Sequence, residues 1–426
     1  MTKYTKTLIS AVATAALMAP AAFAEEPQEY TPSSGNADVE FIDQVQLGNV
    51  WSNVQVHVPT STGNVISNSL AVGNTTTAIN ERGSLAASID QQQRGAVEAN
   101  TDVWAGSVHG DVVATTNATG NSTYAGNWHG NTDVDIWQAS RENVTATSRV
   151  DVEDALAVSA HTSAVANTAE IEVDFADVAE GSINQRTQGS VFAGSDVEVG
   201  FAEEFVQNTA IAAGNSGQAH VGDTADASIS VNQSTDSYET IVASAQTRVD
   251  DVVDIANTSA AAGNQFTGSN FNSSVEFGVP SEVAQQTNRS EVFASSDVVA
   301  GQFFGSAAST ASGVGNAFSA SSIYGGTNTD VNQLNTGNVG SDATLNASSF
   351  SGGAGFVTAT SFGNSFSSVG QETGLTGGVR QVNRGNVTAS TSFRTPGSVG
   401  SVSASSSAIG NSATVETRSN NTGRGN

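Results

Sequence analysis

The chain of 426 residues contains no cysteine, which excludes disulfide bonds, thiolate metal ligands and lipid attachment to an N-terminal cysteine. Lysine is confined to Lys3 and Lys6, so the chain after residue 24 carries 12 Arg against 41 Asp and Glu. That difference, a net charge of −29, argues against nucleic acid and anionic lipid as partners. Residues 25–330 hold 38 acids and 7 Arg, whereas residues 331–426 hold 3 acids and 5 Arg, so an acidic body precedes a nearly neutral end.

The sequence also lacks long hydrophobic runs. The apolar run from Leu8 to Met18 has 11 residues, fewer than the roughly 20 that a transmembrane helix needs. Lys3 and Lys6 precede this run and Ala22-Phe23-Ala24 follow it, which is the pattern of a secretory signal peptide over residues 1–24. We therefore expect an exported protein, with residues 25–40 as an N-terminal linker or cap.

A series of glutamines marks an internal repeat. They recur every 47, 47, 47, 48, 53, 47 and 48 residues, and each is followed 29 to 31 residues later by an asparagine. A fixed period of this kind is typical of a solenoid or array, here with eight repeats. The glutamines are Gln44, Gln91, Gln138, Gln185, Gln233, Gln286, Gln333 and Gln381, and the asparagines are Asn74, Asn121, Asn167, Asn215, Asn264, Asn316, Asn364 and Asn411.

Each repeat divides again, because a Gly-Asn pair occurs at two places about 24 residues apart, as at Gly48-Asn49 and Gly73-Asn74. Alternating residues such as Val54, Val56 and Val58 indicate strands. The sequence thus predicts an all-β fold, a parallel β-solenoid over residues 41–411 with two rungs in each repeat, followed by a polar tail at 412–426. Sixteen stacked rungs would measure roughly 75 to 80 Å, and a single wide rung per repeat would halve that length.

Two columns of residues support stacked repeats. Seven of the eight repeats place a large apolar residue 12 positions after the glutamine, and repeat five has Ala245 there. Repeat five also has two extra residues after Gln233, which predict a register shift or a bulge. Small residues stand three positions before each asparagine. The Gly beside the asparagine is expected to supply a positive φ for a turn. The large column is Val56, Val103, Val150, Val197, Val298, Leu345 and Phe393; the small one is Ala71, Ala118, Ala164, Ala212, Ala261, Gly313, Ser361 and Ala408.

We interpret the sixteen Gln and Asn residues as a structural ladder, in which side-chain amides bond from rung to rung inside the solenoid; binding groups on a repetitive face are the alternative. No catalytic, cofactor-binding or metal-binding residue is predicted, because the five His share no spacing and the acids are spread along the body. Two acidic clusters, Asp250-Asp251-Asp254 and Glu203-Glu204, are interpreted as solvated rather than as weak Ca²⁺ sites. Trp51, Trp104, Trp128 and Trp137 are candidates either for stacking on sugars or for core or cap positions.

The signal peptide followed by Gln- and Gly-Asn-punctuated repeats resembles the curlin class of surface proteins, although curlin units are shorter and more tightly spaced. In length, acidity and Ala-x-Gly-Asn pattern, as at Ala71-Val72-Gly73-Asn74, the chain more closely resembles the holdfast anchor protein D (HfaD) family. That resemblance implies a protein at the cell surface, associated with the outer membrane, that anchors an adhesive polysaccharide. It implies as partners that polysaccharide, a small curlin-like anchor protein and a lipoprotein exporter.

The function expected from these observations is non-enzymatic anchoring of a holdfast polysaccharide, without a cofactor. The nearly neutral repeats after residue 331, rich in Phe, are the expected protein-contact end. Alternatives are a self-assembling fibre subunit, a secreted adhesin and a polysaccharide-degrading enzyme. Self-association is left open, because a solenoid ends in strands that lack a pairing partner.

Overall fold

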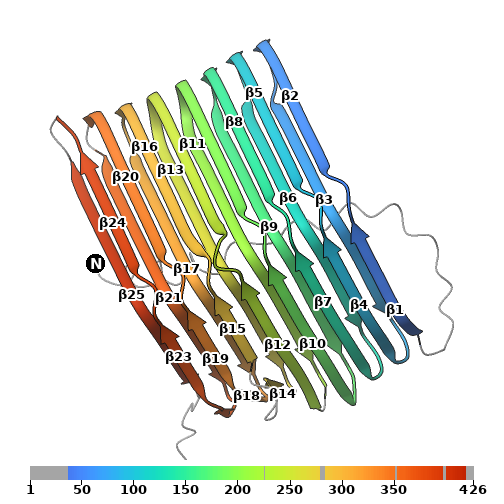
Figure 1. Cartoon of the computed structure of the whole chain (residues 1–426). Coiled ribbons are helices and arrows are strands. Elements are labelled where there is room, and N and C mark those ends of the chain that lie inside the picture. Colours follow the sequence, from blue (N-terminus) through green and yellow to red (C-terminus); the bar gives the residue numbers. More distant parts are fainter. Residues whose placement is uncertain (1–36, 225, 279–283, 351–352, 397–399, 419–426) are drawn as a thin grey trace, which may run out of the picture. The chain divides into compact units, whose positions relative to one another are not determined.

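The computed structural model describes residues 37–224, 226–278, 284–350, 353–396 and 400–418, apart from the side chains of residues 37–40, 284 and 350. These residues are almost entirely β-strand, and no helix occurs among them. All of the strand pairings are parallel, and the strands follow one another through the stack in sequence order (Figure 1). The all-β class and the parallel β-solenoid expected from the sequence are confirmed.

The stack contains one rung per repeat, so the expectation of two rungs per repeat is wrong. Gln44 aligns with Gln91, and Gln91 aligns with Gln138, each pair lying 47 residues apart. No strand in the described residues pairs with the segment about 24 residues away. Seven steps of roughly 4.8 Å give a stack of about 34 Å, half the length expected for sixteen rungs.

Each rung has three strand positions, which we call the first, second and third strands. The first strands form an 11-stranded sheet, while the second and third strands belong to a 14-stranded sheet. The first strands are β1 (Ala37–Gln46), β4 (Leu85–Gln93), β7 (Thr132–Ser140), β10 (Val178–Thr187) and β12 (Asp226–Thr235), and in rungs six to eight the pairs β14 (Ser274–Phe277) and β15 (Ala284–Asn288), β18 (Gly326–Thr329) and β19 (Val331–Asn335), and β22 (Leu375–Thr376) and β23 (Val379–Asn383).

The second and third strands run on continuously in rungs four and five and are separated by a corner elsewhere. The second strands are β2 (Val50–Ser61), β5 (Val97–Val108), β8 (Val144–Ala155), β16 (Glu291–Phe303), β20 (Val339–Phe350) and β24 (Val387–Arg394). The third strands are β3 (Val65–Asn80), β6 (Asp111–Asn127), β9 (Ala157–Asp174), β17 (Ser306–Ile323), β21 (Ala354–Gln371) and β25 (Ser401–Arg418). The joined strands are β11 (Val191–Gly222) and β13 (Thr240–Phe271).

The third strand lies against both of the other strands of its rung. Its first half faces the second strand, as shown by the buried hydrogen bond between the hydroxyls of Thr116 and Thr101 at 2.7 Å. Its second half faces the first strand, since Thr123 donates to Gln91 at 2.9 Å. Alternating residues along all three strands therefore point into the space between two layers, which is the period-two pattern that a strand imposes.

The apolar core is divided into two compartments. One contains Val103 and Ala118 and lies between the second and third strands, and the other contains Ile89 and Ala125 and lies between the first and third strands. Asn121 stands between Ala118 and Ala125 on β6, and equivalent Asn residues take this place in the other rungs. A polar wall therefore separates two apolar columns along the stack.

Repeat five shows the two-residue register shift expected from the sequence, without a bulge at Ala245. Its extra residues lie in the turn between β12 and the second-strand part of β13, and Thr247 takes the column position between Val197 and Val298. Thr247 is fully buried and donates to Oδ1 of Asn257 at 3.0 Å, which satisfies its hydroxyl. The other residues that lengthen this repeat to 53 residues lie between Phe277 and Ala284. Residues 279–283 of that segment fall outside the described part of the chain. All eight members of the small column align as predicted.

The Gly before the ladder asparagine is needed for close stacking and not for a positive φ, which corrects the sequence-based expectation. A Cβ on Gly315 would lie 2.5 Å from the carbonyl oxygen of Gly363, and one on Gly363 equally close to that of Gly410. Positive φ occurs instead at the turn from the third strand to the next rung, for example 120° at Gly130 and 60° at Tyr324. Glycine thus allows neighbouring backbones to approach each other beside the ladder.

The strands extend from Ala37 to Arg418, and so cover four residues before and seven after the segment 41–411 assigned to the solenoid. Residues 1–24, assigned to a signal peptide, and most of the proposed linker lie outside the described residues. No helix in the described part of the chain is long and apolar enough to cross a membrane.

Candidate functional site

The eight predicted glutamines form one continuous ladder through the stack, which we call the Gln ladder. In every step Nε2 of one Gln donates to Oε1 of the Gln in the preceding rung, over distances of 2.7 to 2.9 Å. Each Nε2 also donates to a backbone carbonyl just after the ladder asparagine of its own rung, as Gln185 does to Ser216 at 2.9 Å. The glutamines therefore link successive rungs and also join the first strand to the third.

The eight asparagines form a second ladder of opposite polarity, which we call the Asn ladder. Nδ2 of each Asn donates to Oδ1 of the Asn in the following rung, over distances of 2.7 to 2.8 Å. Four of them also donate to a backbone carbonyl of the next first strand, as Asn167 does to Arg186 at 3.0 Å. The backbone acceptors fix the orientation of both amides, so the opposite polarity follows from the geometry.

A third polar column, two residues after each ladder glutamine, escaped the sequence analysis because its residue type changes along the chain. Asn288 donates to Asn335 and Asn335 to Asn383, each at 2.7 Å. The same side chains donate to the backbone of the following turn, as Asn335 does to Gly337 at 2.9 Å. The common signal is hydrogen-bonding capacity: the column is Gln46, Gln93, Ser140, Thr187, Thr235, Asn288, Asn335 and Asn383.

These columns provide hydrogen-bond partners for most of the buried amide groups along the stack. Ladder residues of the inner rungs, such as Gln185 and Asn215, are at most 2% exposed. Each net hydrogen bond contributes on the order of 1 kcal/mol, and losing a partner in a buried network costs more than that. The ladder residues are therefore inaccessible to a ligand except at the two ends of the stack, so any binding surface must lie on the outer faces or at the end rungs.

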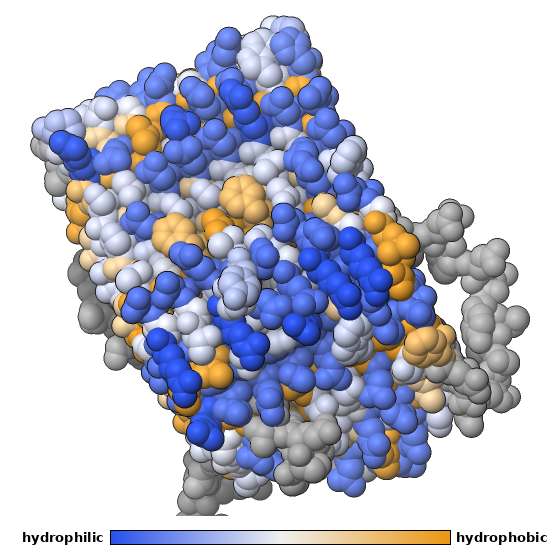
Figure 2. Space-filling view, viewed as in Figure 1, coloured by the Kyte–Doolittle hydropathy of each residue, from blue (hydrophilic) through white to orange (hydrophobic). Residues whose placement is uncertain are grey.

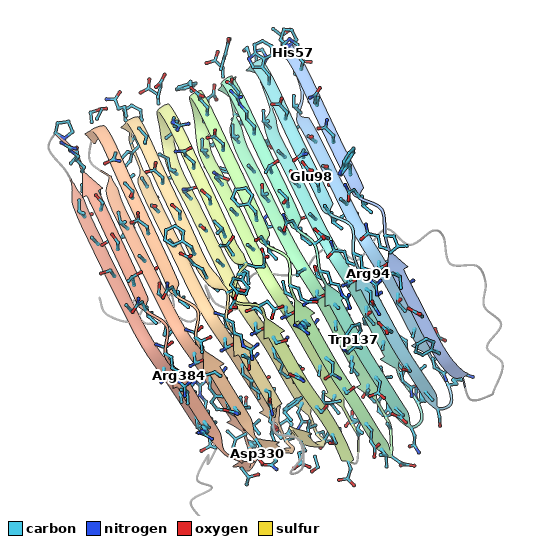
Figure 3. All side chains as sticks on the ribbon, in the orientation of Figure 1. His57, Arg94, Glu98, Trp137, Asp330 and Arg384 are labelled. Atoms are coloured by element: carbon cyan, nitrogen blue, oxygen red, sulfur yellow. The ribbon has the colours of Figure 1, made fainter. Side chains whose placement is uncertain are left out.

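The tryptophans are outside the core, which excludes the core interpretation of them. Trp51 is 73% exposed, Trp137 is 38% exposed, and Trp104 and Trp128 are partly exposed. His57 stacks on Trp104 across two rungs with their ring centroids 4.2 Å apart. Figure 3 shows His57 at the far end of the second strands and Trp137 on a first strand, so the His57–Trp104 stack and Trp137 do not form one site.

The face of the molecule seen in Figure 2 is largely hydrophilic, with apolar patches scattered over it. Two exposed ion pairs connect rungs, between Arg186 and Asp236 at 3.2 Å and between Arg248 and Asp196 at 3.4 Å. Within the described ranges, no group of three or more His, Asp and Glu residues has a geometry that could hold a metal ion. Oδ1 of Asp254, in one of the acidic clusters, accepts hydrogen bonds from the backbone and hydroxyl of Ser306.

Three groups with shifted pKa values lie on the outer face of the third strands in rungs two and three. Burial, together with a 2.6 Å hydrogen bond to Glu172, raises the pKa of Tyr124. Burial also raises the pKa of Glu170, against the opposing effect of His220, whose Nε2 lies 3.7 Å from its carboxylate. Burial lowers the pKa of His161. These groups lie on neighbouring strands, and each shift has burial as its main cause.

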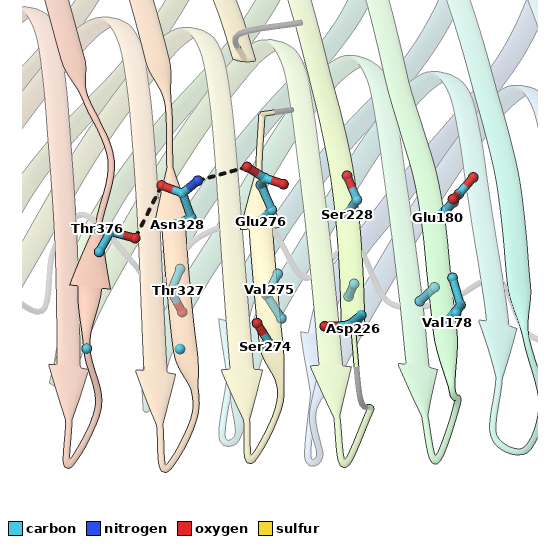
Figure 4. A pocket seen from close by; sticks show the side chains of 14 residues that line it. Val178, Glu180, Asp226, Ser228, Ser274, Val275, Glu276, Thr327, Asn328 and Thr376 are labelled. Carbon is cyan, nitrogen blue, oxygen red and sulfur yellow. Dashed lines mark hydrogen bonds between the residues drawn. The ribbon is translucent and has the colours of Figure 1, made fainter. Parts of the chain in front are cut away.

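A polar trough crosses the outer face of the first strands from rung four to rung eight (Figure 4). Its volume is about 630 Å³, within the range of small-molecule pockets. Glu276 accepts from Nδ2 of Asn328 at 2.8 Å, and Oδ1 of Asn328 accepts from Thr376 at 3.4 Å. Small residues such as Ser274, Gly326 and Gly374 line part of the trough, so little side-chain volume fills that part of the face. Its carboxylate, amide and hydroxyl groups are suited to hydrogen-bonding sugar hydroxyls, and no described residue that lines it is aromatic.

The fold and its ladders define a class: a periodic β-solenoid protein whose polar interior is structural and whose outer faces and ends are available for attachment. Comparison with protein families gives the particular family. The model of holdfast attachment protein D (HfaD) matches residues 59–340 and 336–425, and the chain belongs to that family. No curated protein and no solved structure matches the chain.

Proposed function

We propose that this protein attaches an adhesive holdfast polysaccharide to the outer membrane at the cell surface, and does so without catalysis. The observation that carries the proposal is membership of the holdfast attachment family over nearly the whole repeat region. The structure suits this role because each rung is bonded to its neighbours through backbone and amide ladders, so load applied to one face is shared along the stack.

The charge distribution supports different roles for the two parts of the chain. Residues 25–330 carry a net charge of −31 and residues 331–426 a net charge of +2. We assign the neutral final repeats to contact with envelope proteins, a curlin-like anchor protein and a lipoprotein exporter being the partners that the resemblance implies. The acidic body, which carries most of the residues that line the polar trough, then faces the matrix.

The test is to delete the gene in its host and measure where the holdfast polysaccharide goes, using a fluorescent lectin on cells and on the rinsed support. Attachment predicts a holdfast of normal composition that is shed from cells and left on the support. Loss of the polysaccharide itself would instead assign the protein to synthesis. Retention on cells with loss of surface fibres would favour the fibre-subunit alternative.

Two further arms separate the finer parts of the proposal. A chain lacking residues 331–426 should be exported but fail to remain on the cell surface, and unchanged retention would show that the assignment of ends is wrong. Purified protein incubated with acidic polysaccharides should release no reducing sugar and generate no unsaturated-uronate absorbance. Release of either product would replace anchoring with an enzymatic function.

A further inference from the structure

The two end rungs of the stack have unpaired edges within the described part of the chain. The first rung (β1, β2 and β3) pairs only with the second, and the last rung (β23, β24 and β25) pairs only with the seventh. The two rungs lie at opposite ends of the stack (Figure 1). An open strand edge is a template for pairing with another chain.

The direction of the hydrogen bonds in the two ladders determines which strand edge can pair with each end of the stack. At the first rung, Gln44 has a donor directed away from the stack, because each Gln donates to the preceding rung, and Asn74 presents its acceptor. At the last rung, Gln381 presents its acceptor and Asn411 its donor. If the first rung of one copy stacks on the last rung of another, Gln44 donates to Gln381 and Asn411 donates to Asn74. Stacking two identical ends would place donor against donor.

Apolar residues match at the same junction. Val50 and Val56 at the first rung, and Phe393 at the last, are only partly buried and pack against the end of the same core compartment. Val56 and Phe393 belong to one column, so continuing the register places one on the other. A second copy would complete the burial of both. The three strands of the first rung contain 10, 12 and 16 residues, comparable to the roughly 20 to 30 residues per side of a stable interface.

Charges match as well. Asp43 precedes the ladder glutamine of the first rung, and Arg380 precedes that of the last, so the same register brings this carboxylate onto this guanidinium. Glu81 and Arg418 also share one register position, seven residues after their ladder asparagines. The side chains of Asp43, Arg380 and Arg418 are all exposed. Complementary charge at two points selects the head-to-tail arrangement over others.

We propose that this protein self-associates head to tail, the first rung of one copy stacking on the last rung of the next with all three polar columns in register. The contact is heterologous, so it does not close and adds one copy after another along the ladder direction. The inference concerns the ends of the stack and is independent of the holdfast role, which rests on the family match.

The experiment uses the mature chain, residues 25–426, and three charge-reversed forms of it: Asp43→Arg, Arg380→Asp and the double variant. Sedimentation velocity over a range of concentrations measures association, and far-UV circular dichroism checks that each form is folded. The wild type should form concentration-dependent oligomers. Each single reversal should weaken association by about tenfold, because it places like charges at the junction.

The decisive arm mixes the two single variants. In a 1:1 mixture, the Arg at position 43 of one variant meets the Asp at position 380 of the other, so association should recover with the two variants alternating. The double variant carries both reversals and should associate without a partner variant. Arg384→Asp on the same rung is the matched control, because its register partner at the junction is the uncharged Leu47. Mixing Arg384→Asp with Asp43→Arg should therefore not restore association. A monomeric wild type at all concentrations, or singles that associate like the wild type, would overturn the proposal, as would a mixture that stays monomeric.

Discussion

Nε2 of Gln185 donates to Oε1 of Gln138 at 2.9 Å, joining two residues 47 positions apart at the boundary between two apolar compartments. The same contact recurs seven times, and the Asn ladder beside it runs the other way. The polar wall thus keeps the rungs in register, since a slip of one residue would break both ladders at once.

Replacing Gln185 with Ala should lower the free energy of unfolding by about 3 kcal/mol, measured by urea denaturation. The substitution removes two donated bonds and leaves Nε2 of Gln233 without its acceptor inside the core. The matched control is Asn184→Ala on the same strand, whose side chain faces outward and bonds only to Ser182 at 3.3 Å. That change should cost less than about 0.5 kcal/mol; equal losses would show that the ladder contributes little.

Changing Asn167 to Asp should destabilise the chain by about 3 to 5 kcal/mol at pH 7, because a buried carboxylate would then face the Asn215 and Arg186 oxygens. Such a carboxylate has a folded-state pKa above its unfolded value, so the cost is present at neutral pH and declines as the pH falls. Urea denaturation of Asn167→Asp at pH 4 and pH 7 should show this relief. Asn167→Ala should lose similar stability at both values, and a pH-independent loss in the Asp variant would contradict the prediction.

The half-buried His161 should make stability depend on pH. Burial lowers its pKa in the folded state, so the unfolded chain binds more protons and stability falls as the pH decreases below about 6.5. The slope due to this one group is at most about 1.4 kcal/mol per pH unit. His161→Asn should flatten the profile between pH 7 and pH 5. Thr209→Asn, at its register neighbour, adds no titratable group and should leave the slope as in the wild type.

Aromatic packing should contribute strongly to the stability of rungs five to seven. Phe318 is 2% exposed, and its ring centroid lies 4.9 Å from that of Phe266 and 5.9 Å from that of Phe366. Phe318→Ala should therefore cost about 4 kcal/mol in thermal or urea unfolding. Phe356 is 46% exposed, and Phe356→Ala should cost less than about 1 kcal/mol. A similar loss from both would mean that the aromatic cluster does not stabilise these rungs.

The sequence was sufficient to predict the β-solenoid, its eight repeats and the alignment of the large and small columns, because a residue repeated at one period must stack on itself. It was misleading on the number of rungs. Gly-Asn pairs recur about 24 residues apart because both the turn after the first strand and the third strand bring glycine backbones close together, as Gly95 and Gly73 show. Local spacing cannot distinguish these places from two equivalent rungs.

Other features depended on three-dimensional context. The column from Gln46 to Asn383 contains four residue types, so its shared role appears only when its hydrogen bonds to the following turn are seen. Thr247 takes the place of an apolar residue because Asn208 and Asn257 supply its partners. The polar trough arises from small side chains on neighbouring rungs and leaves no motif in any one repeat.

Disulfide cross-linking of introduced cysteines tests the single-rung architecture most directly. Because the chain has no native cysteine, only the introduced pair can form a disulfide. Ser182 and Ser230 are register partners on adjacent first strands, with outward-facing side chains. The pair Ser182→Cys and Ser230→Cys should form an intramolecular disulfide on mild oxidation, detected by mass spectrometry, because adjacent strands place Cα atoms within the usual 4.4 to 6.8 Å. The pair Ser182→Cys and Phe205→Cys, about half a repeat apart, should remain reduced. Cross-linking of the second pair and not of the first would contradict the account.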